Sequence, residues 1–228
     1  MGIIEHIAII PLFKGLSRKQ LEELAMIVLN QRVKRGQIIF AEGDDGIGFY
    51  VLTSGRAKIF KLSPDGKEQI LHIMPPGEPI GEVAVFAGEP FPAFAEALED
   101  GNALFFPKAA FIELIKGNPS LALAMMAILS RRLRKFTAMI EALSLKEVPG
   151  RLAAHFLYLG REGGKNASLT LDISKNQLAS LMGTIPETLS RILARMAREG
   201  LIETSGQRHI RILDWKGLEE LAEGERRL

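Results

Sequence analysis

Two oppositely charged residues, Glu187 and Arg191, have the side-chain types and the spacing needed to read DNA bases. A carboxylate accepts hydrogen bonds from the amino group of cytosine or adenine, and a guanidinium donates two to the O6 and N7 of guanine. Because residues four apart share one face of a helix, both side chains would point the same way. The alternative is a solvated ion pair within the helix, which the spacing alone favours.

The residues around this pair predict the elements that would hold it. Ser174 is a suitable N-cap for a helix over 175–182, and Gly183 permits the positive φ of a tight turn. Pro186 suits the first position of a second helix that runs to about residue 198, because its missing N–H is not needed there. Apolar residues at helical spacing predict the buried face of this second helix: Leu189, Ile192, Leu193 and Met196. Two helices joined by a glycine-containing turn are typical of a helix-turn-helix, whose second helix enters the DNA major groove.

A strand hairpin is predicted after the second helix. Two short runs, 201–204 and 209–212, flank the Ser205-Gly206 turn and resemble the wing of a winged helix-turn-helix. Three side chains near the tip are predicted phosphate contacts, the alternative being a merely solvated surface: Gln207, Arg208 and Arg211. Residues 146–213 carry ten Lys or Arg against six Asp or Glu, an excess of positive charge that suits a phosphate backbone.

A long helix is predicted over 119–145, beginning at Asn118-Pro119. Apolar residues step along it by four and three in turn: Ala122, Met126, Leu129, Leu133, Phe136, Ile140 and Leu143. This heptad pattern is typical of a coiled coil and predicts a homodimer. The alternative is a helix packed only on its own domain, but such a helix extends ~40 Å, longer than a small β-domain needs.

Residues 33–106 have the pattern of a β-domain, with glycines at loop-like intervals. Short apolar or alternating runs predict strands at 37–40, 49–52, 57–62, 69–74 and 103–106. Ser63-Pro64-Asp65-Gly66 predicts a hairpin turn, and many short strands favour a β-sandwich or barrel. Before them, Ser17 and Gln20 form a capping-box pattern that starts a helix, with apolar positions at Leu21, Leu24, Ala25, Val28 and Leu29.

These features occur in an order that resembles the cyclic-AMP receptor and fumarate-nitrate reduction regulator (CRP/FNR) superfamily of bacterial transcription factors. The resemblance covers nearly the whole chain, and it is carried by the long helix together with these motifs: Pro11-Leu12-Phe13, Gly36-x-x-Ile39-Phe40-x-Glu42-Gly43-Asp44, Phe49-Tyr50-x-Leu52-x-Ser54-Gly55, Pro76-Gly77-Glu78, Gly81-Glu82 and Glu187-Thr188-Leu189-Ser190-Arg191. It implies an α+β protein with a β jelly-roll sensor domain at 1–117, a dimerisation helix at 118–145 and a winged helix-turn-helix at 146–228.

The resemblance also implies partners and site residues. Double-stranded DNA with a palindromic operator, a second copy of the chain and RNA polymerase are the expected partners, with no membrane. The DNA-binding residues are predicted to be Ser174, Glu187, Thr188, Ser190, Arg191 and Arg208. The cyclic-AMP branch of the family has a further arginine where this sequence has Pro186, so the half-site resembles TTGA.

The effector site departs from the cyclic-AMP branch. That branch follows its Gly-Glu pair with Arg-Ser, whereas here Gly81-Glu82 is followed by Phe91-Pro92. A cyclic phosphate would then be buried without its bidentate cation, so we expect no cyclic nucleotide. The long-helix positions that contact adenine in that branch correspond to Phe136 and Thr137. A flat apolar cofactor, a small hydrophobic effector or no effector remains, with these candidate pocket residues: Gly81, Glu82, Phe91, Pro92, Phe94, Met125, Phe136, Thr137, Met139 and Ile140. The alternative is that the apolar members are ordinary core and helix seam.

The absence of cysteine removes thiolate ligands and therefore an iron–sulfur cluster. Short motifs near 118–124, 141–146 and 186–191 look closest to the nitric-oxide-responsive (Dnr and HcpR) regulators, which implies haem as a candidate cofactor for sensing nitrosative stress. His72, on a predicted sensor strand, and His6 are the candidate axial ligands, although a lone histidine is more often structural.

Composition and missing motifs exclude other classes. The 228 residues are 47% hydrophobic and 25% charged, which is typical of a globular protein rather than a disordered one. The longest apolar run, Leu121 to Leu129, is too short to cross a bilayer, so we expect a cytoplasmic protein. No P-loop, H-E-x-x-H motif, triad or paired carboxylates at useful spacing are present, so we expect no enzyme. The alternative function is a regulatory module for another small molecule that does not bind DNA, as in a kinase regulatory subunit or channel domain.

Overall fold

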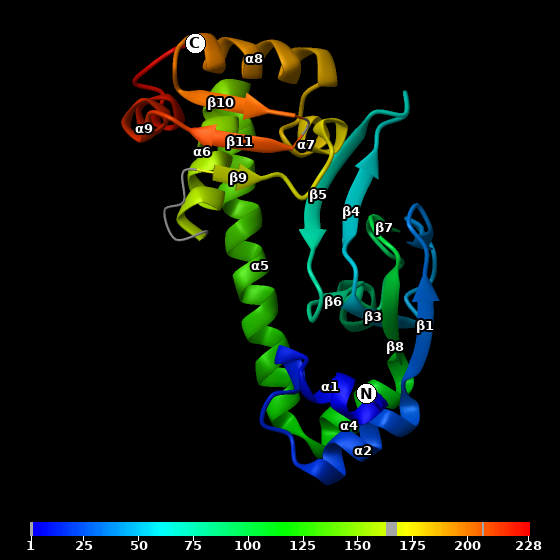
Figure 1. The fold of residues 1–228 in the computed structure, drawn as a ribbon. Helices are drawn as coiled ribbons and strands as arrows, with labels where there is room; N and C mark the ends of the chain where they lie inside the picture. Colours follow the sequence, from blue (N-terminus) through cyan, green and yellow to red (C-terminus); the bar gives the residue numbers. More distant parts are fainter. Residues whose placement is uncertain (1, 163–167, 207) are drawn as a thin grey trace. The chain divides into compact units, whose positions relative to one another are not determined.

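The computed structural model describes residues 2–162, 168–206 and 208–228. The predicted phosphate contact Gln207 therefore lies outside the described residues. The chain divides into two compact units, Met1–Arg132 and Leu133–Leu228, and the boundary falls inside one long helix. Each unit has its own sheets and helices (Figure 1).

The first unit contains two four-stranded antiparallel sheets. The order in one sheet is β1 (Leu29–Val33), β8 (Gly101–Pro107), β3 (Gly48–Ser54) and β6 (Pro79–Ile80). The order in the other is β2 (Ile38–Phe40), β7 (Phe94–Ala97), β4 (Ala57–Leu62) and β5 (Glu68–Met74). The predicted turn at 63–66 joins β4 to β5, and Gly66 has a φ of 80° there. The predicted β jelly-roll fold of the first unit is thereby confirmed.

Alternation along the strands gives the first sheet two buried faces. On β3, Leu52 joins the cluster between the sheets, while Phe49 and Val51 lie on the opposite face. Small side chains fill much of the space between the sheets: Ala57, Ala84, Ala95, Ala97 and Ala103. Because residues i and i+1 point to opposite faces of a strand, a strand buried on both sides is apolar at successive positions.

Helices cover the outer face of the first sheet. They are α1 (Ile3–Ala8), η1 (Pro11–Phe13), α2 (Arg18–Ile27), α4 (Lys108–Gly117) and the start of α5 (Pro119–Leu145). Four fully buried phenylalanines join them to the sheet: Phe13, Phe49, Phe106 and Phe111. Phe49 stacks on Phe106 with ring centroids 4.9 Å apart, and Phe111 meets Phe49 edge-on at 4.7 Å. This aromatic cluster anchors the N-terminal helices.

The helix predicted after Ser17 forms, but it ends earlier than the apolar spacing indicates. Ser17 and Gln20 make the expected capping box. The prediction that Leu29 belongs to this helix is wrong: Val28 is extended and Leu29 begins β1, opposite Phe105 of β8. An apolar run containing Ile27 and Val28 suits either element, and the backbone hydrogen bonds to β8 decide in favour of the strand.

The helix α5 spans the predicted residues and has two different apolar faces. Leu121, Met125 and Ile128 are buried in the first unit. The heptad face is largely exposed, with exposed fractions of 53% at Met126, 67% at Leu133, 37% at Phe136 and 65% at Ile140.

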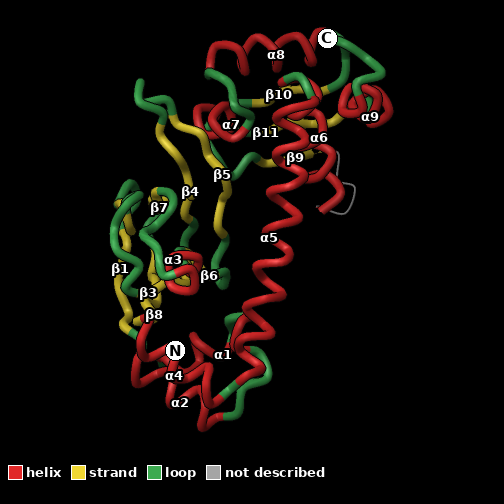
Figure 2. Tube along the Cα trace, turned by 180° about the vertical axis from the view of Figure 1, so that it is seen from behind, coloured by secondary structure: helices red, strands yellow, loops and turns green. Residues whose placement is uncertain are grey.

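In its described residues, the second unit has a three-stranded sheet and four helices besides its part of α5. Figure 2 shows these helices and strands. Its elements are α6 (Val148–Glu162), β9 (Ser168–Thr170), α7 (Lys175–Leu181), α8 (Pro186–Arg198), β10 (Ile202–Ser205), β11 (His209–Ile212) and α9 (Trp215–Glu223). The sheet order is β10-β11-β9, so a third strand joins the predicted hairpin, which α9 follows. The predicted helix-turn-helix and hairpin wing are confirmed.

Among the described residues, no single helix is long and apolar enough to cross a membrane. The pair α4 and α5 passes the same criterion of length and composition only when taken together across a bend of 115°.

Burial of the His155 ring in α6 lowers its pKa from 6.5 to about 4. The folded protein then binds this proton less readily than the unfolded chain does. Stability from the neutral ring is therefore fully present above pH 6.5 and is lost as the pH falls towards 4, by up to about 3 kcal/mol. Trp215 is the single tryptophan, and it packs against Gly160 of α6. Its fluorescence, followed during urea unfolding at pH 7 and at pH 5, should report this loss of stability.

His155→Gln should reduce the difference in the free energy of unfolding between pH 7 and pH 5. The matched control, His209→Gln, changes an exposed histidine of β11 and should keep the wild-type difference. Equal behaviour of the two variants would contradict the assignment to His155.

Candidate DNA-binding surface and effector region

The first helix of the helix-turn-helix begins at Ser174, as predicted. The Ser174 hydroxyl accepts from the Gln177 N–H at 3.2 Å, and the Gln177 side chain accepts from the Ser174 N–H at 2.8 Å. The hydroxyl proton of Ser174 is not used in this capping box, because an N-cap oxygen acts as an acceptor. It therefore remains able to donate to a phosphate.

The turn between α7 and α8 is held from outside by Arg151 of α6. Its Nε and Nη2 donate to the Met182 carbonyl at 3.0 and 2.8 Å, and Nη1 donates to the Lys146 carbonyl. Gly183 has a φ of 64°, as the tight turn requires. The role of Arg151 was not predicted, because a single arginine on a helix gives no signal that it binds a carbonyl 31 residues along the chain.

The recognition helix α8 separates an apolar face from a polar one. Leu189, Leu193 and Met196 are buried, while Glu187, Ser190 and Arg191 are exposed. One contact of the guanidinium matters for base reading: Arg191 Nη2 donates to the Thr188 hydroxyl at 3.2 Å. Within the described part of the chain, no ion pair joins Glu187 to Arg191. The carboxylate and the guanidinium are therefore not neutralised by each other.

Among the described residues of the wing, Arg211 has an ion-pair partner and Arg208 has none. Arg208 is exposed at the turn between β10 and β11, and its carbonyl accepts from the Leu171 N–H at 2.7 Å. Arg211 forms an ion pair with Glu203 across the hairpin at 2.8 Å. Because this pairing offsets the charge of Arg211, Arg208 is the better candidate of the two for a phosphate contact.

A second ion network lies at the end of α8. Glu199 accepts from Arg195 at 3.2 Å and from Arg226 of the C-terminal segment at 3.1 Å. The network ties the last turn of the recognition helix to residues that follow α9. It is a feature that the sequence analysis did not identify.

The effector region of the first unit is built on a buried ion pair. Glu82, which begins α3 (Glu82–Ala87), is fully buried and pairs with Arg132 of α5. The Arg132 Nη2 also donates to the Pro79 carbonyl and lies 3.4 Å from Glu78 Oε2. The pair therefore joins the β-roll to the long helix within the first unit.

Two polar atoms of this pair have no hydrogen-bond partner: Glu82 Oε2 and Arg132 Nε. Burial raises the pKa of the Glu82 carboxyl, although Arg132 acts in the opposite direction. A buried unpartnered donor beside an unpartnered acceptor suits a small polar group that can both donate and accept. The sequence signal for this pair was the spacing of Arg132, which continues the buried stripe formed by Leu121, Met125 and Ile128 of α5.

An aromatic stack lies directly beside Gly81. The rings of Phe91 and Phe40 are stacked with centroids 3.9 Å apart and an angle of 15°. Gly81 has a φ of 82°, and a Cβ there would lie 2.7 Å from the Phe91 ring. Backbone hydrogen bonds of 2.9 Å from Phe91 to Asp44 and from Gly43 to Phe91 fix this position. The space next to Gly81 is thus filled by the protein's own side chains.

The other predicted effector residues are not gathered around Phe91. Pro92 is exposed, and Phe94 stacks on Phe60 at 5.3 Å, on the face of β7 opposite to Ala95. The reason is the alternation of side chains along β7, which separates neighbours in sequence. Met125 is part of the core beneath the helices.

Four predicted effector residues belong to the part of α5 in the second unit. Phe136 and Ile140 are exposed by 37% and 65%, and the exposed Thr137 donates to the Leu133 carbonyl at 3.0 Å. Met139, on the same stretch, is partly exposed.

The two histidines proposed as haem ligands lie on different elements. His6 is on α1, where its Nδ1 is 3.0 Å from the Gly2 carbonyl oxygen, and α1 packs on α2. His72 is partly buried on β5, opposite Ile59 of β4. Among the described residues there is no group of three or more His, Asp or Glu side chains suited to a metal ion.

The two lysines of β4 already have acidic partners. Lys58 is buried and pairs with Glu68 and Glu96. Lys61 pairs with Glu42 and donates to the Pro92 carbonyl at 3.0 Å. Neither side chain is thus an unpaired cation awaiting a phosphate.

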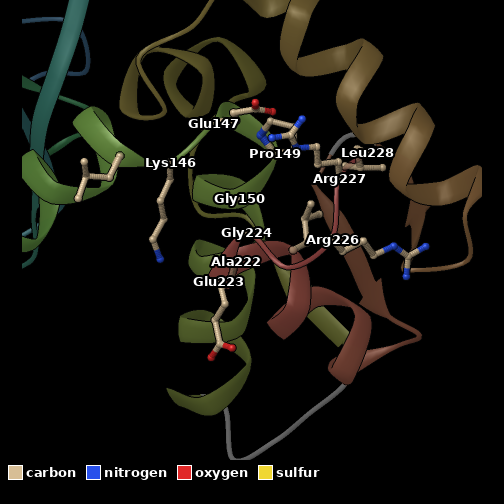
Figure 3. Close-up of a pocket in the computed structure, with 12 residues that line it drawn as sticks. Lys146, Glu147, Pro149, Gly150, Ala222, Glu223, Gly224, Arg226, Arg227 and Leu228 are labelled. Carbon is tan, nitrogen blue, oxygen red and sulfur yellow. The ribbon is translucent and has the colours of Figure 1, made fainter.

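A pocket of about 180 Å³ lies in the second unit, between the start of α6 and the residues that follow α9 (Figure 3). Its lining contains charges of both signs, among them the cations Lys146 and Arg227 and the carboxylates of Glu147 and Glu223. None of the predicted effector residues lines it, so it is distinct from the effector region.

Comparison with known proteins identifies relatives of both units. Residues 30–118 match the model of the cyclic nucleotide-binding domain, and residues 150–221 match that of the Crp-like helix-turn-helix domain. The cyclic AMP receptor protein of Thermus thermophilus is 33% identical over 215 residues, covering 94% of this chain and 97% of that protein. The transcriptional activator protein FnrA of Stutzerimonas stutzeri is 31% identical over 215 residues, covering 92% and 87%.

Solved structures show the same similarity. The catabolite activator protein of Thermus thermophilus has a TM-score of 0.54 at 30% identity, covering 95% of this chain and 100% of that one. A CooA mutant from Carboxydothermus hydrogenoformans has a TM-score of 0.76 over 92% of each chain, and its 22% identity supports the fold alone.

The buried pair predicts a large difference between two neighbouring arginines. Arg132→Met should destabilise the first unit by about 3–5 kcal/mol, because it leaves the Glu82 carboxylate buried without its partner. The control Arg131→Met removes an exposed arginine of the same helix and should change stability by about 0.5 kcal/mol or less. Urea unfolding measures both values, and equal losses would show that Glu82 does not depend on Arg132.

Proposed function

Since this chain belongs to the CRP/FNR family of DNA-binding transcription regulators, we propose that it acts as a homodimer that reads a palindromic operator under the control of an effector. Its relatives are transcription regulators and not enzymes. In this proposal residues 1–117 sense the effector, 118–145 form the dimer and 146–228 bind DNA, with RNA polymerase as a further partner.

The observation that carries the proposal is the first half of α8. It exposes a carboxylate at Glu187 and a guanidinium at Arg191 that are not paired with each other, on a helix whose other face is buried. In a helix-turn-helix this helix lies in the major groove, where these groups match base edges. Ser190 adds a short polar contact, while Ser174, Thr188 and Arg208 serve the backbone. The proposed half-site is of the TTGA type.

Dimerisation is proposed to use the exposed heptad face of α5. An apolar stripe of this length on a helix is costly in water and suits an identical stripe on a second copy. Closely spaced recognition helices on a two-fold dimer would then meet two half-sites about one helical turn apart.

The effector is proposed to act at the Glu82–Arg132 pair and not to be a cyclic nucleotide. The unpartnered atoms of the pair support a small polar ligand, and Arg132 belongs to the helix proposed for dimerisation. Phe91 stands where the cyclic-AMP branch has its phosphate-binding arginine. A ligand without a phosphate group fits these residues better, and it would change the contact between the roll and α5.

Haem as a sensor of nitric oxide rests on the resemblance of short motifs to the Dnr and HcpR types. The described residues give no support for a haem held by both proposed histidines, because the His6 Nδ1 lies 3.0 Å from the Gly2 carbonyl oxygen on α1, whereas His72 lies on β5 opposite Ile59. The stacked rings of Phe91 and Phe40 also occupy the space beside Gly81. We therefore derive no role for haem in the mechanism.

Truncation of Arg191 tests the proposed base reading. Arg191→Ala should cost about 1–3 kcal/mol per half-site and relax discrimination at one base pair, because a bidentate contact to guanine is lost. Arg208→Ala is the contrast: it should weaken binding to all sequences alike and reduce the dependence on salt. Gel shifts with single-base variants of a TTGA palindrome measure both, and a uniform loss for Arg191→Ala would refute base reading by this residue.

Charge placed in the heptad face tests dimerisation. Leu133→Glu and Phe136→Glu should each give monomers that no longer bind the palindrome, because carboxylates would face each other in an apolar seam. Ala138→Glu is the control, since Ala138 is exposed on α5 but lies outside the heptad positions. Sedimentation distinguishes the two states, and a normal dimer of both seam variants would overturn the proposal.

Calorimetry tests the effector assignment. The protein should show no binding of cyclic AMP or cyclic GMP at micromolar concentrations. The reason is that Phe91 stands where the phosphate-binding arginine is expected and that both lysines of β4 are paired with carboxylates. The cyclic AMP receptor protein of Thermus thermophilus serves as the positive control under the same conditions. A saturable micromolar isotherm would overturn the exclusion of cyclic nucleotides.

A further inference from the structure

Ile185 occupies an unusual position at the start of the recognition helix. It is the N-cap of α8, and its carbonyl accepts the first helical hydrogen bond, from the Leu189 N–H at 3.0 Å. Its side chain is 48% exposed. Two residues later comes Glu187, so Ile185 lies at the same end of α8 as the residues proposed to read bases.

An isoleucine is a poor choice for this position on grounds of stability. An N-cap side chain normally accepts a hydrogen bond from a backbone N–H of the first turn, which favours Ser, Thr, Asp and Asn. Ser174 does so for α7, whereas no side-chain cap bond is present at Ile185. Residues that break a local rule without compensation in the fold tend to mark functional positions.

Exposure alone would not assign a function, because single apolar side chains are common on protein surfaces. The surroundings of Ile185 add the second observation. Of the exposed side chains that follow on α8, all but the small Ala194 are polar or charged, among them Glu187, Ser190 and Arg191. An apolar group thus stands at the edge of a surface built for hydrogen bonding.

The major groove offers one apolar group to such a surface, the C5 methyl of thymine. The N-terminal residues of a recognition helix are those that meet base edges. We propose that Ile185 contacts the methyl group of a thymine in each half-site and thereby determines specificity. This inference rests on the proposed function, because it names a further contact of the same DNA-binding surface.

The experiment replaces thymine by uracil, which removes the methyl group and leaves the base pair intact. The probe is a duplex with two TTGA half-sites, in which each thymine position, on either strand, is substituted in turn in both half-sites. Substitution of uracil at one of these positions should lower the affinity of the wild-type protein for the duplex about fourfold per half-site, or about fifteenfold when both half-sites are substituted. That factor corresponds to burial of one methyl group, at about 0.8 kcal/mol.

Variants then assign the methyl effect to one side chain. Ile185→Ala should bind the thymine and uracil duplexes equally, while still discriminating at the guanine read by Arg191. Leu213→Ala is the matched control, because Leu213 is also 48% exposed in the same unit but follows β11. It should keep the wild-type preference for thymine.

A stability measurement separates this role from a structural one. Ile185→Ser supplies the missing cap, so it should raise the midpoint of thermal unfolding while abolishing the preference for thymine over uracil. A merely structural residue would not show this opposition between stability and base preference.

The outcomes are distinguishable from those that test the proposed function. Specific binding of the palindrome with no uracil effect at any position, or a uracil effect that persists in Ile185→Ala, would overturn the role of Ile185 and leave the proposed function standing. Failure of the wild-type protein to prefer the palindrome over unrelated DNA would overturn the proposed function and this inference with it.

Discussion

The buried ion pair between Glu82 and Arg132 is the contact on which the proposed control of this protein depends. Removing two charges from water is costly unless each is well paired, so the roll and the long helix are held at one defined contact. The pair is incompletely satisfied, with one free acceptor and one free donor. A ligand that completes these hydrogen bonds would alter the free energy of the contact. Because Arg132 lies on α5, that change would reach the helix whose exposed face is proposed to form the dimer.

Aromatic side chains determine which ligands can approach this pair. Phe91 and Phe40 fill the space beside Gly81, and the glycine is required there because any Cβ would collide with the Phe91 ring. The stack replaces the cation that an anionic effector needs. The family's general framework of sheets and helices is thus retained, while the chemistry at one position of the roll is changed from charged to apolar. This change is the physical basis for the proposal that the effector is not a cyclic nucleotide.

The DNA-binding unit shows how a surface is kept available for a partner. The apolar side of α8 is buried, Arg151 clamps the preceding turn through two carbonyls, and Glu203 and Glu199 engage arginines away from the first turn of α8. Glu187 and Arg191 are left without an ion pair to each other. Ile185 departs from the usual preference for a polar N-cap at this same end of the helix, which is the pattern expected where binding outweighs local stability.

Local sequence signals were sufficient for the elements that depend on neighbouring residues. The capping boxes at Ser17 and Ser174, the turn at Gly183, the ends of α5 and α8 and the β4–β5 hairpin follow from propensity and periodicity, because their hydrogen bonds are formed within a few residues. The strand at Leu29, the clamp by Arg151 and the pair of Glu82 with Arg132 join residues far apart in the chain. Only the tertiary structure decided them, since periodicity identifies which side of an element is buried but not which distant group it meets. The same limit applied to Phe94, which lies on the face of β7 opposite to Ala95 and stacks on Phe60, whereas Phe91 stacks on Phe40.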